Sequence, residues 1–217
     1  MPQVMKRVRA VEAHRKASSR AATKALAATP HLFGEIRQPE GRYILILRHS
    51  SERRRIIPIG FMSPEVIVGD ANLCIPNAGL YEFGVLTSRM HMAWVSHVCG
   101  RIKSDYRYTN QVVYNNFPWP DLRAEQTKAI AGKTRAAIEA AAQAVLDARA
   151  AEVDATLADL YNPPMPVTLL KTHRTLDAVV DAAYALNGGK RSWKADAERV
   201  AFLFTRYEAL TNMADSA

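Results

Sequence analysis

The sequence predicts an α+β fold, in which a small mixed β-sheet domain with flanking helices precedes an all-α helical C-terminal domain. Short runs rich in branched residues recur between residues 43 and 108, as is typical of strands. Residues 124–160 are instead rich in Ala, Glu and Lys, which favour a helix. Between these patterns, residues 115–120 (NNFPWP) are incompatible with regular structure. We therefore expect a first domain over residues 1–120 and a second over residues 121–217.

The first domain is expected to begin with a helix over residues 2–28, which the following Pro30 ends. Its apolar face would hold Val4, Met5, Val8 and Val11. Strands are predicted at residues 43–47, 56–61, 66–68, 72–75, 81–86 and 101–108. Residues 88–98 have helical spacing, and Gly100 can end that helix. Aromatic and Met side chains are expected to pack this domain rather than stack on bases, namely Met92, Trp94, Tyr114, Phe117 and Trp119.

The second domain is predicted to contain three helices. The first covers residues 124–160, with a thin apolar stripe formed by Ile130, Ile138, Val145 and Leu157. The second covers residues 167–186, with an inward face formed by Leu169, Leu176, Val180, Ala183 and Tyr184. A third helix would be capped by Ser192 and would direct inward Trp193, Val200, Phe204 and Tyr207.

The distribution of charge predicts a polyanionic partner for the first part of the chain. The net charge is +8. Residues 1–120 contain 17 Lys and Arg against 8 Asp and Glu, whereas residues 121–217 contain 12 against 13. Nucleic acid is the usual partner of such a surface, although a merely solvated basic surface would have the same composition. With two Cys and no run of 18 apolar residues, we expect a reduced, cytoplasmic protein without a membrane partner.

One motif invites a catalytic interpretation. Asn162-Pro163-Pro164 resembles the Asn-Pro-Pro-aromatic signature of adenine methyltransferases, in which the turn follows a strand and receives a flipped base. Here Met165 replaces the aromatic residue, and the preceding VDATLADL is helical in pattern. No Gly-rich cofactor loop follows a strand. We therefore interpret the motif as a break between two helices, and we predict no catalytic or metal-binding residue in this chain.

The run RIKSDYRY, residues 101–108, has the residue types that read DNA bases. In one continuous strand, alternate residues share a face, which would group Arg101, Lys103, Asp105 and Arg107. Arg and Lys donate to guanine, and Asp accepts from the cytosine amino group. A solvent-facing strand with ion pairs is an equally good explanation of the pattern. Phosphate contacts are predicted for six nearby cations: Arg53, Arg54, Arg55, Lys6, Arg7 and Arg9.

Three segments together resemble a known family: SSERRRIIPIGF (residues 50–61), LYEFGVLTSRMHMAWVSHVCG (80–100) and RIKSDYRYTNQVVYNNFPWP (101–120). They are similar to the target-recognition domain of MmeI-like DNA methyltransferases, single-chain type II restriction-modification enzymes whose relatives include YeeA-like class I methyltransferases. LADLYNPPMPVTLLKTHRTLDAVVDAAY (residues 157–184) resembles the helical segment that closes those chains.

This resemblance implies a module that reads double-stranded DNA for adenine N6 methylation. The S-adenosylmethionine site and the true Asn-Pro-Pro-aromatic motif would lie in an upstream methyltransferase domain of the same bacterial parent protein, and this chain would carry no cofactor and no activity alone. Some family members add a nuclease. The resemblance implies Lys103, Asp105 and Arg107 as the leading base-reading residues, with Arg48 and Asp70 as weaker candidates.

Two alternatives remain open on the sequence. One is a complete adenine methyltransferase that uses Asn162, which the missing cofactor loop disfavours. The other is a protein- or RNA-interaction module with a basic surface and no duplex sequence preference. The thin apolar stripe of the long helix supports this second alternative, because such a stripe can require a partner.

Overall fold

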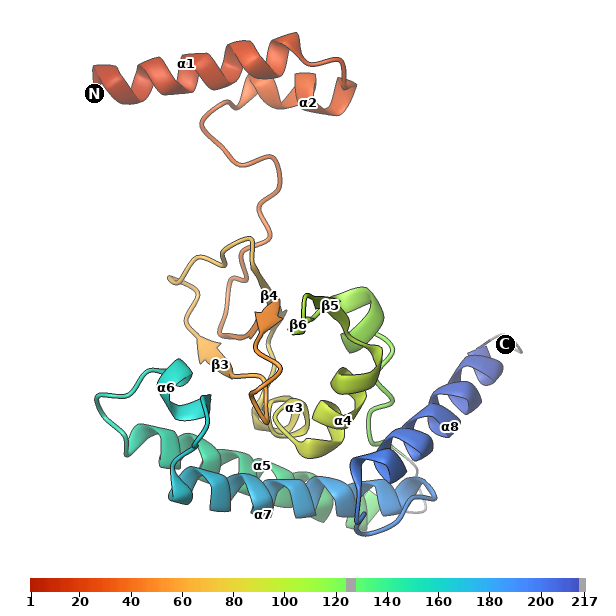
Figure 1. The fold of residues 1–217 in the computed structure, drawn as a ribbon. Coiled ribbons are helices and arrows are strands. Elements are labelled where there is room, and N and C mark those ends of the chain that lie inside the picture. The colour runs from red at the N-terminus through yellow and green to blue at the C-terminus, as the bar shows by residue number, and fades with distance from the viewer. Residues whose placement is uncertain (124–127, 215–217) are drawn as a thin grey trace. The chain divides into compact units, whose positions relative to one another are not determined.

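The computed structural model describes residues 1–123 and 128–214, and Figure 1 traces them. The chain forms two compact units, Met1–Gln38 and Pro39–Ala217. The predicted α+β class is confirmed: short antiparallel strands and two helices are followed by a helical region. No helix in the described ranges is long and apolar enough to cross a membrane.

The first unit is a helical hairpin rather than one helix over residues 2–28. Helix α1 (Pro2–Ala17) ends where Ser18 adopts an extended conformation, and α2 (Ala21–Ala25) continues into a 3-10 turn, η1 (Leu26–Ala28). The Arg15 guanidinium donates to the carbonyl oxygens of Leu26, Thr29 and Leu32, each at 2.9 Å. These bonds hold the second segment against α1, which the helical pattern alone does not reveal. No residue of α1 is buried, and Val4, Met5 and Val11 of the predicted apolar face are exposed.

The second unit contains two three-stranded antiparallel sheets in place of the single mixed sheet expected. In the first sheet, β1 (Tyr43–Leu47) lies between β3 (Ile59–Met62) and β4 (Asn72–Pro76). In the second, β6 (Asp105–Arg107) lies between β2 (His49–Ser50) and β5 (Gly100–Ile102). The strands predicted at 43–47 and 72–75 are confirmed. The strand predicted at 56–61 begins only at Ile59, and residues 66–68 form none.

Residues 81–86 form a helix, so the strand predicted there is wrong. Helix α3 (Leu80–Leu86) begins after Gly79, whose N–H donates to the Glu82 carboxylate at 2.7 Å. Nearly every residue of α3 is buried, which removes the polar face that distinguishes helical from strand periodicity. The following α4 (Arg89–Val98) confirms the helix predicted there, with Ser88 as its N-cap, but it ends before Gly100.

In the helical region, one helix ends earlier than predicted and another begins later. A π-helical turn, η2 (Asn110–Tyr114), precedes this region. The long helix α5 covers Lys128–Ala150 and ends ten residues before the predicted end at residue 160. The first residues predicted for this helix, 124–127, lie outside the described residues. Thr156 then caps a separate helix, α6 (Leu157–Tyr161), through a capping box with Asp159. Helix α8 (Asp196–Ala214) begins four residues after Ser192, which therefore does not cap it.

The junction at YNPPMP is a helix break, as predicted. Asn162 caps the end of α6, and α7 (Val167–Ala183) begins after Pro166 and continues into a 3-10 turn, η4 (Tyr184–Asn187). The five predicted inward residues of this helix are all fully buried. In α5, Ile138 and Val145 of the predicted stripe are buried, whereas Ile130 is exposed.

One hydrophobic core runs through the second unit, from β1 and β3 through α3 and α4 to α5, α7 and α8. Helices α5 and α7 lie side by side, with α3 packed on α5 and α4 against α8 (Figure 1). Gly84 permits the close approach of α3, because a Cβ atom there would lie 2.8 Å from Ile138 Cγ2. Trp94 is buried and its Nε1–H donates to the Val113 carbonyl at 3.0 Å, which confirms its packing role.

Candidate nucleic-acid interface

The RIKSDYRY run folds as a hairpin, so the continuous strand predicted over residues 101–108 is wrong. Strands β5 and β6 pair with Ile102 opposite Asp105, which leaves Lys103 and Ser104 as a two-residue turn. Lys103 has a φ of 56°, in the left-handed region that such tight hairpin turns use. The alternation argument fails at this turn, because the chain reverses between Ile102 and Asp105.

The hairpin and β2 together expose one face to solvent. Asp105 and Arg107 are two residues apart on β6 and therefore share a face. His49 pairs directly with Arg107 across the sheet, so its side chain joins them. All three are exposed, whereas Ser50 and Tyr106, on the opposite face, are 4% and 7% exposed. We call the surface formed by His49, Ile102, Asp105 and Arg107 the reading face.

Arg101 does not belong to the reading face. It pairs with Tyr106, and its guanidinium carbon lies 4.1 Å from the centre of the Tyr106 ring. The same group donates to the carbonyl oxygens of Ser104 at 2.7 Å and Ser96 at 3.3 Å. These contacts fasten the hairpin turn to the end of α4. The structure thus brings Asp105 and Arg107 together, places Lys103 at the tip, and separates Arg101 from them.

Arg48 and Asp70, the two weaker candidates, lie next to this hairpin. The backbone N–H of Arg48 donates to the Ala71 carbonyl at 3.1 Å, and the Arg48 carbonyl accepts from the Tyr108 N–H at 2.7 Å. Arg48 thus links the two sheets, with Asp70 in the turn just before β4. Arg48 is therefore joined by backbone hydrogen bonds to segments that border the reading face, and Asp70 directly precedes Ala71, the residue that accepts from Arg48.

The arginine loop, residues 51–55, is attached to the reading face and to the helical region. The Asp105 carboxylate accepts from the Glu52 N–H at 3.1 Å, and the Arg54 N–H closes a turn on the Ser51 carbonyl. Arg54 Nε donates to the Asn162 side-chain oxygen at 3.0 Å, so this arginine is held against the α6–α7 junction. Asn162 therefore has a structural partner here.

The other two arginines of the loop are oriented differently. Arg53 and Arg55 line a shallow pocket of about 260 Å³ together with Tyr161, Pro163 and Pro164. Within the described ranges neither guanidinium takes part in a hydrogen bond or ion pair, which leaves both available to an anion. The other predicted phosphate ligands, Lys6, Arg7 and Arg9, are exposed on α1 in the first unit.

A buried aromatic and histidine pair supports the hairpin from behind. His91 Nδ1 lies 2.9 Å from the Leu86 carbonyl oxygen and donates to it, so Nε2 accepts from the Tyr108 hydroxyl at 3.1 Å. The Phe117 ring meets His91 edge-on, with 4.8 Å between ring centres. Burial lowers the pKa of His91 to about 4, which keeps the imidazole neutral. Because Tyr108 directly follows β6, this pair fixes the hairpin on α4.

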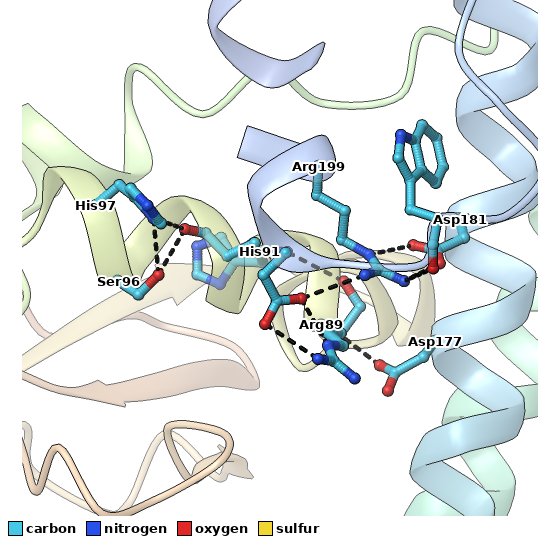
Figure 2. Close-up of polar contacts among 11 residues, drawn as sticks. Arg89, His91, Ser96, His97, Asp177, Asp181 and Arg199 are labelled. Atoms are coloured by element: carbon cyan, nitrogen blue, oxygen red, sulfur yellow. Dashed lines mark hydrogen bonds and ion pairs between the residues drawn. The ribbon is translucent and has the colours of Figure 1, made fainter. Parts of the chain in front are cut away.

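Charged side chains join the start of α4 to α7 and α8, as Figure 2 shows. The Asp177 carboxylate accepts from the backbone N–H of Arg89 at 2.7 Å, and the Arg89 guanidinium pairs with Asp196 at 2.6 Å. A buried pair, Arg199 with Asp181, lies beside them. Burial raises the pKa of Asp177 to about 6, against the opposing effect of the Arg89 hydrogen bond. These contacts hold α4, and with it the hairpin, on the helical region.

A second buried group links the helical region to the first sheet. Arg149 of α5 donates through Nη1 to the Ile59 carbonyl at 2.8 Å and through Nε to the Tyr161 hydroxyl at 2.8 Å. The Tyr161 hydroxyl also lies 2.6 Å from His173 Nε2, to which it donates its proton. Burial, and then the Arg149 charge, lower the pKa of His173 to about 3. This network anchors β3 and the loop that precedes it.

The reading face and the arginine loop expose hydrogen-bond donors and acceptors together with charged groups. No group of three or more metal-ligating side chains occurs among residues 1–123 and 128–214. The sequence does not predict that His49 lies on this face, because neither a two-residue strand nor its pairing register can be inferred from the residue pattern. It also missed the Arg54–Asn162 contact, which joins residues 108 positions apart. The exposed carboxylate of Asp105 and the exposed guanidinium of Arg107, on one strand, are the distinctive chemical feature of the reading face.

Comparisons with known proteins agree with this fold. The family model of the MmeI target recognition domain matches residues 1–121, and that of the MmeI C-terminal domain matches residues 130–214. DNA methyltransferase A of Bacillus subtilis (strain 168) is 36% identical over 211 residues, which are 97% of this chain and 22% of that protein. A solved structure of the Type IIL restriction-modification enzyme MmeI in complex with DNA superposes with a TM-score of 0.84 at 42% identity.

The superposition covers 98% of this chain and 27% of the MmeI chain. The chain therefore spans about a quarter of the length of the relatives it matches. The two family models together account for the sheets and the helical region described above. The chain belongs to the MmeI family, as its target recognition domain followed by its C-terminal domain.

Proposed function

We propose that this chain is the sequence-specific double-stranded DNA recognition module of a bacterial, cytoplasmic adenine-N6 methyltransferase of the restriction-modification type. The observation that carries the proposal is the reading face, where Asp105 and Arg107 lie exposed on one strand with Lys103 at the hairpin tip. Arg and Lys donate to guanine O6 and N7, and Asp accepts from cytosine N4. The complex of MmeI with DNA, a relative at 42% identity, supports the same conclusion.

The remaining candidates divide into positioning and phosphate roles. Arg48 and Asp70 would read bases at the edge of the reading face. Arg101 would hold the hairpin rather than a base, because its guanidinium is already bonded to Ser104 and Ser96. Phosphates would be bound by Arg53 and Arg55, with Arg54 bracing their loop on Asn162. Lys6, Arg7 and Arg9 are proposed as further phosphate ligands on α1.

Methyl transfer is assigned to another domain of the parent protein, which would bind S-adenosylmethionine. Asn162 caps α6 and accepts a hydrogen bond from Arg54, so it is not presented to a base. The alternative of a general interaction module loses most of its support, because Ile138 and Val145 of the α5 stripe are buried in the core.

Selection of bound duplexes from a randomised library tests the proposal. Wild type should enrich one motif, and Asp105→Asn should change the preferred base at one position of it. Asn keeps an acceptor for the Glu52 N–H but favours adenine over cytosine, and one such contact discriminates by about 1–3 kcal/mol. Asp154→Asn, at an exposed carboxylate outside both sheets, is the matched control and should leave the motif unchanged. Binding without any enriched motif would refute sequence recognition and leave phosphate attraction alone.

A further inference from the structure

The reading face holds a side chain to which neither the family pattern nor the charge pattern assigns a role. His49 lies on β2, the edge strand next to β6, and its register partner is Arg107. Its side chain is exposed, while its neighbour Ser50 is buried on the other face with Tyr106. Register and burial therefore agree in placing the His49 imidazole beside the Arg107 guanidinium on the solvent side.

An imidazole in this place has the hydrogen-bonding capacity to read a base edge. Neutral His offers one N–H donor and one nitrogen acceptor, a combination that Arg and Lys lack. Directly paired residues on neighbouring antiparallel strands have Cβ atoms about 4.5–5.5 Å apart. One base-pair step is about 3.4 Å along each strand of the duplex, so this separation is about one and a half steps. His49 and Arg107 can therefore reach the same base pair or two adjacent ones.

The spacing along β6 separates this pair from Asp105. Residues two apart on a strand lie about 6.6–6.8 Å from one another, close to two base-pair steps. The row formed by His49 and Arg107 is thus displaced along β6 from the row that holds Asp105, whose register partner is Ile102. Two rows on one face would address two separate positions of a DNA site.

We propose that His49 is a specificity-determining residue that reads, together with Arg107, a base-pair position distinct from that of Asp105. This inference rests on the proposed function and extends it to a residue outside the hairpin. It makes the short strand β2 part of the recognition surface rather than a mere support for β6.

Duplex selection with four variants of the full chain tests this inference. His49→Ala and Arg107→Ala should each relax base preference at the same or an adjacent position, while Asp105→Asn should change a different one. The relaxed position should lose about 5- to 160-fold of discrimination, the range that corresponds to one base contact of about 1–3 kcal/mol. His97→Ala, at an exposed histidine of α4, is the matched control and should leave the motif intact.

The outcomes separate this inference from the proposed function. An unchanged motif for His49→Ala, with Asp105→Asn still altering it, would overturn the role of His49 and leave sequence recognition standing. Loss of binding to all sequences at an unchanged melting temperature would make His49 a backbone contact and overturn the inference as well. If His49→Ala fails to fold, His49→Asn provides the same comparison with a smaller change. A wild-type chain that enriches no motif would overturn the proposed function itself.

Discussion

His91 should make the protein less stable in mild acid. Its pKa falls to about 4 in the folded state, against 6.5 for an ordinary histidine, because burial disfavours the charged ring. The unfolded chain therefore binds more protons between these values, and stability declines as pH falls through 6.5 towards 4. From pH 7 to pH 5 this one group should cost about 2 kcal/mol.

The variant His91→Phe tests that source of acid sensitivity. Phenylalanine fills a similar volume next to Phe117 but cannot titrate, so the stability difference between pH 7 and pH 5 should shrink by about 2 kcal/mol. At pH 7 the variant should be less stable by about 1–3 kcal/mol, because the Leu86 carbonyl and the Tyr108 hydroxyl lose their partner. Urea unfolding of both proteins at the two pH values measures this. If the stability difference between pH 7 and pH 5 is unchanged in the variant, the acid sensitivity arises from another group, and His173 is the next one to substitute.

Asp177 should act in the opposite direction. Its carboxyl is buried, and its pKa rises to about 6 in the folded state against 3.8 ordinarily. The folded state then binds the extra proton between these values, so stability falls as pH rises through this window. Asp177→Asn keeps an oxygen for the Arg89 N–H and removes the charge. Between pH 5 and pH 7, the free energy of unfolding of this variant should rise by about 1 kcal/mol relative to that of wild type. Parallel pH profiles for the two proteins would contradict this assignment.

The sequence predicts the types of side chain in the candidate interface but not the face on which each of them lies. The sequence predicts Asp105 and Arg107 as base-reading side chains because of their chemistry, and the strand β6 places them on one face. It places Arg101 with them incorrectly, because the turn at Lys103 depends on a positive φ in a residue that rarely adopts one. His49 joins the face through a tertiary pairing, so residue chemistry alone does not reveal it.

At the scale of elements, the packing of α3 on α5 should respond differently to two glycine substitutions. Gly84→Ala would place a Cβ 2.8 Å from Ile138 Cγ2 and 3.2 Å from Ala142 Cβ, so the helices must separate. We expect a loss of about 1–3 kcal/mol. Gly132→Ala in α5 meets nothing within 4 Å and should instead gain about 0.5–1 kcal/mol from helix propensity.

Thermal and urea unfolding of the two alanine variants provide the comparison. Both changes add one methyl group to a helix, so their difference reports the close approach at Gly84 rather than a general effect of alanine. A Gly84→Ala protein as stable as wild type would mean that α3 and α5 can move apart without cost. That result would also mean that the packing of the two helices does not require a glycine at residue 84.

Elements were predicted best where branched residues or a partly exposed face identify them, and worst where a helix is buried on nearly every side. The helix at α4 and the strand β1 follow their patterns, and Ser88 and the YNPPMP junction give clear local boundaries. Helix α3 was mistaken for a strand because its residues are buried on nearly every side. The break after Ala150 was missed because the capping box at Thr156 and Asp159 lies inside a sequence of high helix propensity.

At the scale of the whole molecule, two descriptions of the chain divide it in different places. The family models separate a recognition domain at residues 1–121 from a C-terminal domain at residues 130–214. The compact units of the structure are instead Met1–Gln38 and Pro39–Ala217. One hydrophobic core extends across the boundary between the two family models. The predicted division near residue 120 thus lies inside the second compact unit. The two descriptions make different predictions for shortened chains.

A chain ending at residue 120 should not fold cooperatively. It would lose α5 and α7, and with them Arg149 at the Ile59 carbonyl and Asp177 at the Arg89 N–H. Phe83, which is fully buried and lies under the Arg149 guanidinium, would be uncovered. Each large apolar side chain returned to water costs about 1.5–3 kcal/mol, against a total stability of about 5–15 kcal/mol for a typical domain.

The matched control is a chain of residues 39–217, which keeps the second unit whole. Circular dichroism during heating should show one sharp transition for residues 39–217 and for the full chain, and only a gradual change for residues 1–120. Amide exchange should likewise protect β1 and α4 in the first two proteins and not in the third. A sharp transition in residues 1–120 would show that the recognition domain folds independently. In that case the contacts from α5 and α7 would serve to orient the reading face rather than to form it.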